Sequence, residues 1–282
     1  MAVVISPSST FLILSSVLLS TLFSPPLAFA QENNALLTGG VLATDRQLSY
    51  LEFSFVMQDD CNLVLYNKGS GFTSNTHRRG VDCSLTLNDL GQLVIRTSNN
   101  QTVWTSPVSA TARRGSYAAV LRPDGQVAVY GPALWWTPAL RSNASAAADA
   151  DANGLRLAKV PMVKNVLFSS QILYDNAELA SRDYTFVMQN DCNLALVKAA
   201  QGVKWQSGTS GNGHNCFVRL DHQGQLAVLD DQYNTLWTSN PAGSARGDYV
   251  LLLQINGQAV VYGPVVWSTS SAVHLHALVQ ES

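Results

Sequence analysis

The chain has 282 residues, of which 46% are hydrophobic and only 13% are charged, and its formal net charge is -2. This length allows two domains of ordinary size, and the charge balance offers neither a basic surface for nucleic acid nor a long acidic tail. Long solvated helix faces would need more lysine and glutamate than this chain has. We therefore expect an all-β architecture.

The first thirty residues have the pattern of a secretory signal. Residues 11–22 form an apolar run that is too short to span a bilayer. Two prolines follow, and then Ala28 and Ala30 supply the small-x-small pattern of a signal-peptidase site, although a basic n-region is missing. We expect cleavage near Ala30, secretion to the extracellular space or the vacuole, and no membrane span in the mature protein. A buried helix is the alternative.

Residues 55–66 read FVMQDDCNLVLY, a segment in which two kinds of side chain alternate. A period of two is the period of a β-strand, whose side chains point to opposite faces. Cysteine and leucine would occupy the face toward the core. The other face would carry Gln58, Asp60, Asn62, Val64 and Tyr66. That second face is either an ordinary solvated surface or a binding site.

The chain repeats itself at an offset of 131 residues, because residues 186–197 read FVMQNDCNLALV. Residues 141–154 are small and polar, so we expect a linker and possible processing site at 141–158. This divides the chain into a signal, two domains, the linker and a tail. The predicted boundaries are 1–30, 31–140, 141–158, 159–270 and 271–282.

A shorter period lies within each copy. Phe72, Trp104 and Trp136 are spaced by 32 residues, and Trp205, Trp237 and Trp267 follow a closely similar spacing. Strand-like segments rich in Val, Leu and Tyr, separated by glycine turns, precede these aromatic residues. Each copy is therefore predicted to contain three equivalent β units around an axis. We expect the tryptophans to point inward and share a core rather than to stack on a ligand.

The four cysteines agree with secretion. Cys61 and Cys83 are 22 residues apart, and Cys192 and Cys216 are 24 apart. Four cysteines allow three connectivities, and the duplication favours the local pairs Cys61–Cys83 and Cys192–Cys216. Each bridge would contribute roughly 3 kcal/mol in the chain-entropy model. A zinc site is the competing use, but neither pair has CxxC spacing.

The motif Gln58-x-Asp60-x-Asn62-x-Val64-x-Tyr66 resembles the QxDxNxVxY motif of the monocot mannose-binding, or bulb-type, lectins. The threefold period, the tryptophans, the one cysteine pair per copy and the VYGP strand ends match that family as well. The tandem layout resembles the two-domain lectin precursors of the taro type. The resemblance implies two tandem β-prism II domains, each with three four-stranded sheets, that bind α-mannosides without a metal or another cofactor.

The resemblance also implies a role for each motif residue. Gln58 would bond the 3-hydroxyl of mannose, Asp60 and Asn62 the axial 2-hydroxyl, and Tyr66 the 4-hydroxyl, while Val64 would pack on the ring carbons. Acid, amide and phenol groups suit sugar hydroxyls, which both donate and accept. Because those hydroxyls are also well solvated in water, we expect roughly millimolar affinity for one site. Several sites in one assembly would raise the avidity.

The other five units depart from the motif. Gln189, Asp191 and Asn193 are kept, but Ala195 and Val197 replace valine and tyrosine, so we expect a weaker site. The weakest candidate keeps the ends of the motif and changes its middle; it comprises Gln254, Asn256, Gln258, Val260 and Tyr262. The remaining units, which begin at Asn88, Arg122 and Asp221, are expected to be structural.

The resemblance further suggests that the two domains pair by exchanging C-terminal strands and then associate into larger homo-oligomers. We take the strands that end at Tyr130 and Tyr262 as the candidates for this exchange, because apolar edges of this kind are a liability when left bare. Two sequons, at Asn100 and Asn143, are candidate glycosylation sites.

Catalysis is not expected. Asp59 and Asp60 would be the best pair of carboxylates for a glycosidase, but neighbouring strand residues point to opposite faces. GxSxG, HExxH and P-loop motifs are absent, and the five histidines show no ligand spacing. We expect a multivalent, defence-related lectin for mannose-rich glycans. The rival is a non-catalytic homologue that has largely lost sugar binding and serves storage, taste or protein binding.

Overall fold

The computed structural model describes residues 34–69, 71–138, 164–240 and 245–270. Several predicted features lie outside the described residues, namely the signal at 1–30, the linker at 141–158, the tail at 271–282 and the sequon at Asn143. Among the residues that are described, no helix is long and apolar enough to cross a membrane.

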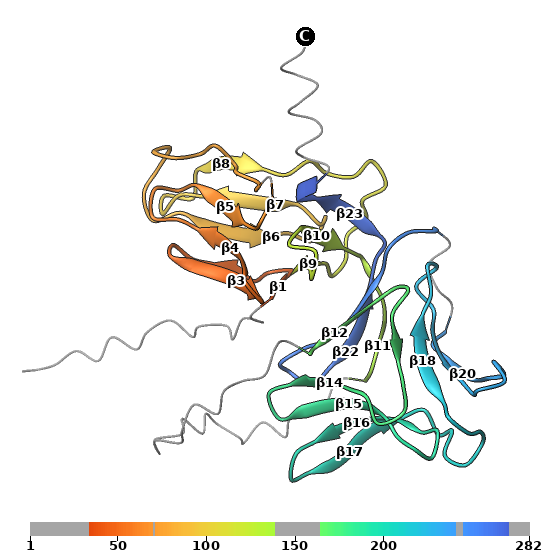
Figure 1. The fold of residues 1–282 in the computed structure, drawn as a ribbon. Coiled ribbons are helices and arrows are strands. Elements are labelled where there is room, and N and C mark those ends of the chain that lie inside the picture. The colour runs from red at the N-terminus through yellow and green to blue at the C-terminus, as the bar shows by residue number, and fades with distance from the viewer. Residues whose placement is uncertain (1–33, 70, 139–163, 241–244, 271–282) are drawn as a thin grey trace, which may run out of the picture.

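The described residues form antiparallel strands joined by tight turns and by longer loops (Figure 1). The strands of the N-terminal half, residues 34–138, are β1 (Ala35–Leu37), β2 (Val41–Leu42), β3 (Arg46–Tyr50), β4 (Phe53–Met57), β5 (Leu63–Tyr66), β6 (Ser84–Leu87), β7 (Leu93–Arg96), β8 (Thr102–Thr105), β9 (Ala118–Leu121), β10 (Val127–Tyr130) and β11 (Ala133–Trp136). The strands of the C-terminal half, residues 164–270, are β12 (Val166–Phe168), β13 (Ile172–Leu173), β14 (Glu178–Ser181), β15 (Tyr184–Met188), β16 (Leu194–Lys198), β17 (Gly202–Gln206), β18 (Phe217–Leu220), β19 (Leu226–Leu229), β20 (Thr235–Thr238), β21 (Val250–Leu253), β22 (Ala259–Tyr262) and β23 (Val265–Ser268).

These strands make six sheets, in agreement with the predicted all-β fold. Five sheets have four strands, with the orders β1-β9-β10-β23, β11-β22-β21-β12, β13-β18-β19-β20, β14-β15-β16-β17 and β2-β6-β7-β8. The sixth, β3-β4-β5, has three strands, and a single bridge between Val64 and Thr73 stands where its fourth strand was expected. The four-stranded expectation is therefore wrong for this one sheet.

Each half encloses an apolar core with three aromatic rings at its centre. Phe72, Trp104 and Trp267 meet with ring centroids 5.8–6.5 Å apart in the first core. Trp135, Trp205 and Trp237 meet at 5.5–5.7 Å in the second. The inward placement of the tryptophans is confirmed for these residues. It is wrong for Trp136, which faces outward and is 55% exposed.

Two disulfides lie within the halves. Cys61 bonds to Cys83 and Cys192 bonds to Cys216, and all four residues are buried in the two cores. These are the two local pairs that the duplicated sequence favours. Each bridge ties the hairpin of one sheet to the start of the next, so two of the three sheets of each half are linked covalently as well as by packing.

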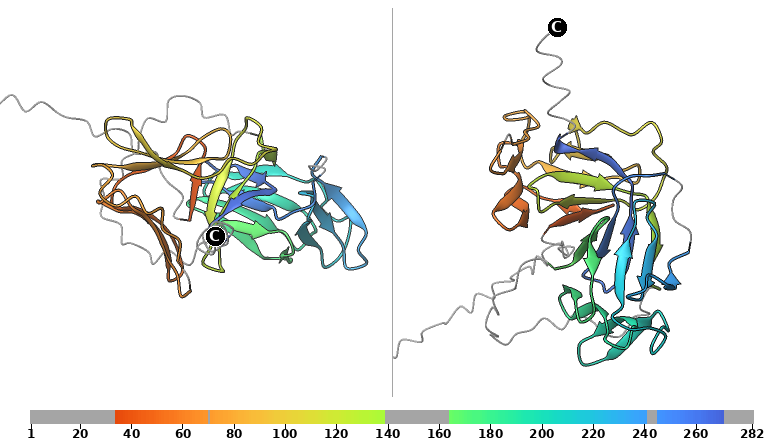
Figure 2. Two further views of the ribbon diagram at one scale, coloured as in Figure 1. Left: turned by 90° about the horizontal axis from the view of Figure 1, so that it is seen from above. Right: turned by 45° about the vertical axis from the view of Figure 1, so that its right-hand side comes forward.

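The two halves exchange their last strands. β11, from the N-terminal half, pairs with β22, and β23, from the C-terminal half, pairs with β10. Figures 1 and 2 show β23 lying on the N-terminal sheets and β11 lying on the C-terminal ones. Thr137 and Thr269 fix the ends, because Ala259 N–H donates to Thr137 Oγ1 at 3.1 Å and Val127 N–H donates to Thr269 Oγ1 at 3.0 Å.

The exchange therefore corrects one prediction. The strands that end at Tyr130 and Tyr262 stay in the sheets of their own halves, paired with β9 and β21. The strands that cross begin after Pro132 and Pro264, at Ala133 and Val265. They cross because Trp135 and Trp267 bury their rings in the core of the opposite half, which each half needs to complete its three aromatic rings.

A third apolar cluster joins the halves. It consists of outward-facing residues of β9, β10, β21 and β22, with Ala35 of β1. Tyr130 and Tyr262 both belong to it, at 0% and 3% exposure. The last sheet of each half thus has two buried faces, one toward its own core and one toward the other half, which accounts for the uninterrupted burial of these four strands.

Candidate functional site

The segment from Gln58 to Tyr66 forms a β-hairpin turn and one strand, rather than the single strand predicted over residues 55–66. β4 ends at Met57 and β5 begins at Leu63. Gln58 N–H donates to the carbonyl of Asn62 at 2.9 Å, and Cys61 takes the left-handed conformation with φ 70°. The turn keeps the five motif residues on one side all the same, and Gln58 Nε2 reaches Tyr66 Oη at 2.9 Å.

Asn62 is held by the segment that follows β5. Its Oδ1 accepts hydrogen bonds from Thr73 Oγ1 at 3.1 Å, Ser74 Oγ at 3.2 Å and Thr76 N–H at 3.1 Å. These donors fix the orientation of the amide. They leave Asn62 Nδ2 without a protein acceptor among the described residues, so it is available to donate outward.

Asp60 lies beside that amide. Its Oδ1 accepts from Asn62 N–H at 2.9 Å, and the described residues supply no hydrogen bond to its other oxygen. Val64 is partly exposed and Tyr66 is 50% exposed, while Leu63 and Leu65 between them are buried. The surface therefore presents a carboxylate acceptor, an amide donor, an amide–phenol pair and an apolar patch, which together match a ring that carries hydroxyls and C–H groups.

The second copy of the motif satisfies its own polar groups. Gln206 occupies the position of Thr73 and accepts from Asn193 Nδ2 at 3.1 Å. Ser210 donates to Asp191 Oδ2 at 2.6 Å, and this hydrogen bond holds the pKa of Asp191 below its usual range. Asn193 and Ala195 are buried. A ligand here would have to displace protein hydrogen bonds that the first copy does not make.

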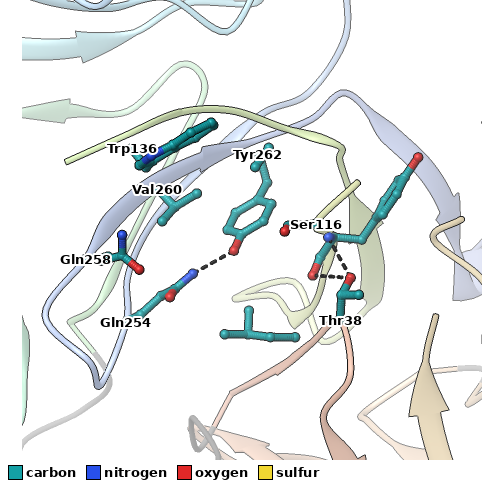
Figure 3. Close-up of a pocket in the computed structure, with 10 residues that line it drawn as sticks. Thr38, Ser116, Trp136, Gln254, Gln258, Val260 and Tyr262 are labelled. Carbon is teal, nitrogen blue, oxygen red and sulfur yellow. Dashed lines mark hydrogen bonds between the residues drawn. The ribbon is translucent and has the colours of Figure 1, made fainter. Parts of the chain in front are cut away.

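The last candidate lies against the junction of the two halves. Gln254 Nε2 donates to Tyr262 Oη at 2.6 Å, much as Gln58 does to Tyr66. Asn256 and Gln258, in the middle, bond to each other through Asn256 Nδ2 and Gln258 Oε1 at 3.1 Å. A cavity of about 330 Å³ opens beside this strand, with Trp136 at its edge (Figure 3).

The three units that we expected to be structural carry charges or internal bonds. Arg122 forms an ion pair with Asp124 at 2.9 Å, and burial raises the pKa of Tyr130 in the same unit to about 12. In the unit at Asn88, Asn88 Nδ2 donates to Gln92 Oε1 at 3.3 Å. The described residues contain no group of three or more His, Cys, Asp or Glu that could hold a metal ion.

Comparison with known proteins gives the family. No protein-family model matches the chain. Mannose-specific lectin 2 of Crocus vernus is 56% identical over 263 residues, which cover 93% of this chain and 97% of that protein. The chain belongs to the bulb-type lectin family. Mannose-specific lectin 2 of Colocasia esculenta is 46% identical, over 89% of this chain and 90% of its own length.

A solved bulb-type lectin shares the arrangement of both halves. The fetuin-binding agglutinin of Scilla campanulata, described as a two-domain lectin, superposes with a TM-score of 0.71 at 29% identity. The match covers 84% of this chain and 99% of that one. The bulb-type fold therefore extends over the tandem layout and not over one half alone.

The structure brings together the residues predicted for each of the three candidate sites and adds one that sequence reasoning misplaced. The 32-residue spacing predicts that Trp136 lies in the core, but Trp136 lines the cavity beside Gln254. The duplication indicates which tryptophan belongs in the core. YGPALWWT aligns with YGPVVWST, and this alignment places Trp135, and not Trp136, in the position of Trp267. Asn100, the predicted sequon within the described residues, is exposed in the turn between β7 and β8.

Proposed function

We propose that this chain binds α-mannose residues of glycans through Gln58, Asp60, Asn62, Val64 and Tyr66. The observation that carries the proposal is the difference between two copies of one motif. In the first copy, Asp60 and Asn62 keep an acceptor and a donor for a ligand, whereas Asp191 and Asn193 bond to Ser210 and Gln206. The Crocus and Colocasia relatives are named mannose-specific lectins, which supports the choice of sugar.

The geometry suits the vicinal hydroxyls of a mannose ring. Asp60 accepts a hydrogen bond from the axial 2-hydroxyl and Asn62 Nδ2 donates one to it, so this hydroxyl acts both as a donor and as an acceptor. Hydrogen bonds to an ionised group are the stronger kind, which makes Asp60 the main determinant. Gln58 and Tyr66 take the 3- and 4-hydroxyls, and Val64 packs on ring carbons. In this proposal every group that contacts the sugar is a side chain of the protein, so neither a metal nor another cofactor takes part.

The function is binding rather than catalysis. In the hairpin turn of residues 58–62, Asp59 is exposed to solvent, while Asp60 already accepts a backbone hydrogen bond. One shallow site gives roughly millimolar affinity because water competes for every hydroxyl. Useful avidity then comes from several Tyr66 sites in one homo-oligomer. We place this lectin in the secretory pathway, outside the cell or in the vacuole, where it acts in defence against mannose-rich surfaces.

A glycan array with inhibition tests this function directly. The full chain should bind mannose-rich glycans, and mannan should inhibit that binding far better than free mannose does. Agglutination of mannan-coated beads, measured beside the array, reports whether the assembly is multivalent. Absence of mannose-dependent binding on the array would favour the rival, a homologue with a storage or protein-binding role.

A further inference from the structure

We propose that the cavity between the two halves is a second saccharide site, which stacks a sugar ring on Trp136 and prefers gluco-configured rings to mannose. Gluco-configured rings, such as glucose and N-acetylglucosamine, carry only equatorial substituents in their β-glycosides. The inference deepens the proposed function, because it rests on the chain being a lectin. It does not depend on the Tyr66 site, which lies on a different sheet.

The cavity is built from both halves of the chain. Its volume of about 330 Å³ falls at the lower end of the range, roughly 300–1,000 Å³, that small-molecule sites occupy. Thr38 and Ser116 come from the N-terminal half, next to β1 and β9, and Trp136 comes from the exchanged strand β11. Gln254 follows β21, and Tyr262 ends β22. Figure 3 shows Trp136, Val260 and the two glutamines on one side of Tyr262, with Ser116 and Thr38 on the other.

Trp136 provides the stacking surface. It pairs with Val260 across β11 and β22, so the two side chains stand next to each other on the outer face of the sheet. The indole is 55% exposed, although the ring beside it in sequence, Trp135, is packed in the core. A large exposed indole at the edge of a cavity fits a ligand with a flat apolar face better than it fits a role in folding.

The cavity lacks the carboxylate and amide pair that we propose binds an axial hydroxyl in the first site. Asn256 and Gln258 stand where Asp60 and Asn62 stand in the first site, and they are bonded to each other. Gln258 Nε2 also donates to the carbonyl of Thr137 at 3.4 Å. The site therefore offers no carboxylate, and its other polar groups include Gln254, which donates to Tyr262, and the exposed hydroxyl of Ser116.

Ring stereochemistry then selects the sugar. A ring with equatorial hydroxyls directs its C–H bonds to both faces and its polar groups to the rim, so it can lie on the indole and still reach Gln254 and Ser116. The axial 2-hydroxyl of mannose would point from one face of that ring. With that face on the indole, the hydroxyl would meet Trp136 or Val260 without a hydrogen-bond partner, and an unpaired buried hydroxyl is unfavourable. Mannose could therefore stack through one face only, whereas a gluco-configured ring can use either.

The same chain contains a natural counterpart without this surface. In the N-terminal sheet, Ser268 occupies the position of Trp136, Asp248 that of Ser116 and Arg122 that of Gln254. This counterpart is charged, since Arg122 is paired with Asp124. The duplication thus supplies the substitution that removes the stacking surface with the least disturbance to the fold, Trp136→Ser.

The test is a titration of the full chain followed by the indole N–H resonances in ¹⁵N–¹H spectra. The probes are methyl β-glucoside, methyl N-acetyl-β-glucosaminide and methyl α-mannoside. We expect at least one gluco-configured glycoside to shift the Trp136 resonance, and Trp136→Ser to weaken its binding about tenfold, the scale of one aromatic contact. Mannoside binding should stay unchanged in this variant. Thermal unfolding checks that this variant folds as the parent does.

The possible results separate this site from the proposed mannose site. Tyr66→Phe should weaken the mannoside and leave the gluco-configured glycosides unchanged. If the parent chain binds a gluco-configured glycoside but not the mannoside, the result counts against the proposed function and not against this cavity. The cavity proposal is overturned if neither gluco-configured probe shifts Trp136 at tens of millimolar, or if Trp136→Ser binds them as the parent does. It is also overturned if the mannoside shifts Trp136 more strongly than they do.

Discussion

At the scale of single residues, the hydrogen bonds already made within the protein decide which copy of the motif is open to a ligand. Asn62 and Asn193 are the same residue in the same turn, and both accept several hydrogen bonds at Oδ1. They differ at Nδ2. Gln206 accepts from Asn193 Nδ2, whereas Thr73, at the equivalent position, donates to Asn62 Oδ1 and leaves Asn62 Nδ2 without an acceptor among the described residues. Gln206 on Asn193 and Ser210 on Asp191 therefore close the second site from a neighbouring segment, without any change in the Gln-x-Asp-x-Asn signature.

Tyr66→Phe should weaken binding of methyl α-mannoside by about 1 kcal/mol, or roughly fivefold. The change removes the hydroxyl that we propose to contact the sugar, and with it the acceptor of Gln58 Nε2. Isothermal titration calorimetry measures the effect. Tyr233→Phe is the matched control, since Tyr233 is an exposed tyrosine of the other half. Equal affinities for Tyr66→Phe and Tyr233→Phe would show that the phenol of Tyr66 takes no part.

Tyr130 should make the fold sensitive to alkali. Burial raises its pKa to about 12, above the usual value near 10. A raised pKa in the folded state gives stability that is complete below pH ~10 and is lost as the pH rises toward ~12. We expect the free energy of unfolding to fall across this window by a smaller amount in Tyr130→Phe, measured by urea denaturation at pH 9 and pH 11.5. Equal losses in the two proteins would contradict this assignment.

At the scale of elements, the period-two pattern predicted the right faces and the wrong connectivity. Residues 55–66 alternate as a strand does, yet residues 58–62 turn back. The alternation persists through the turn because Cys61 must reach Cys83 in the core while Asp60 and Asn62 cap the turn from outside. The Asp-Asp-Cys-Asn sequence is rich in residues that favour turns, so its composition predicts a turn at this point.

The spacing of the tryptophans does not by itself predict which of them pack in which core. Phe72, Trp104 and Trp136 have an even spacing, but the third ring of that core is Trp267 from the opposite half. A period in the sequence indicates that units are equivalent, but it does not indicate which half of the chain each unit packs against. The disulfides and the general fold follow from the duplication because they are local to each half, whereas the exchanged strands are not.

Trp135→Ala should destabilise the C-terminal half by about 3–5 kcal/mol, the usual effect of removing a large aromatic side chain from a core. Trp135 packs edge-on against Trp205 and Trp237, so its loss leaves a cavity at their centre. Trp136→Ala is the matched control, with an expected change below about 0.5 kcal/mol because its indole is exposed. Urea denaturation followed by fluorescence measures both, and similar effects of the two changes would refute the placement of these rings.

At the scale of the whole molecule, neither half is complete alone. Each core takes one tryptophan from the other half, and each final sheet takes its fourth strand from there. The Tyr130 and Tyr262 faces are used for this junction, which leaves the Gln58–Tyr66 hairpin on a separate sheet open to ligand. The duplicated chain thus combines one motif copy whose polar groups stay open to a ligand with a junction that builds the Trp136 cavity.

A fragment of residues 31–140 should not persist as a stable monomer. It lacks β23, so β10 would have a bare edge and Phe72 and Trp104 would lack their third ring. We expect the fragment to dimerise by placing β11 of each copy beside β10 of the other, or to precipitate. Size-exclusion chromatography with light scattering distinguishes these from a monomer, and a folded monomeric fragment would contradict the structural need for exchange.

The central claim is that the first copy of the motif, and not the second, is the mannose site. Calorimetric titration of methyl α-mannoside into Asp60→Ala and Asp191→Ala tests it most directly. We expect Asp60→Ala to lose more than about tenfold in affinity, because hydrogen bonds to a charged group contribute about 1.5–3 kcal/mol. Asp191→Ala should bind as the parent does, since Ser210 already occupies that carboxylate. Unchanged binding by Asp60→Ala, or a loss confined to Asp191→Ala, would contradict the account.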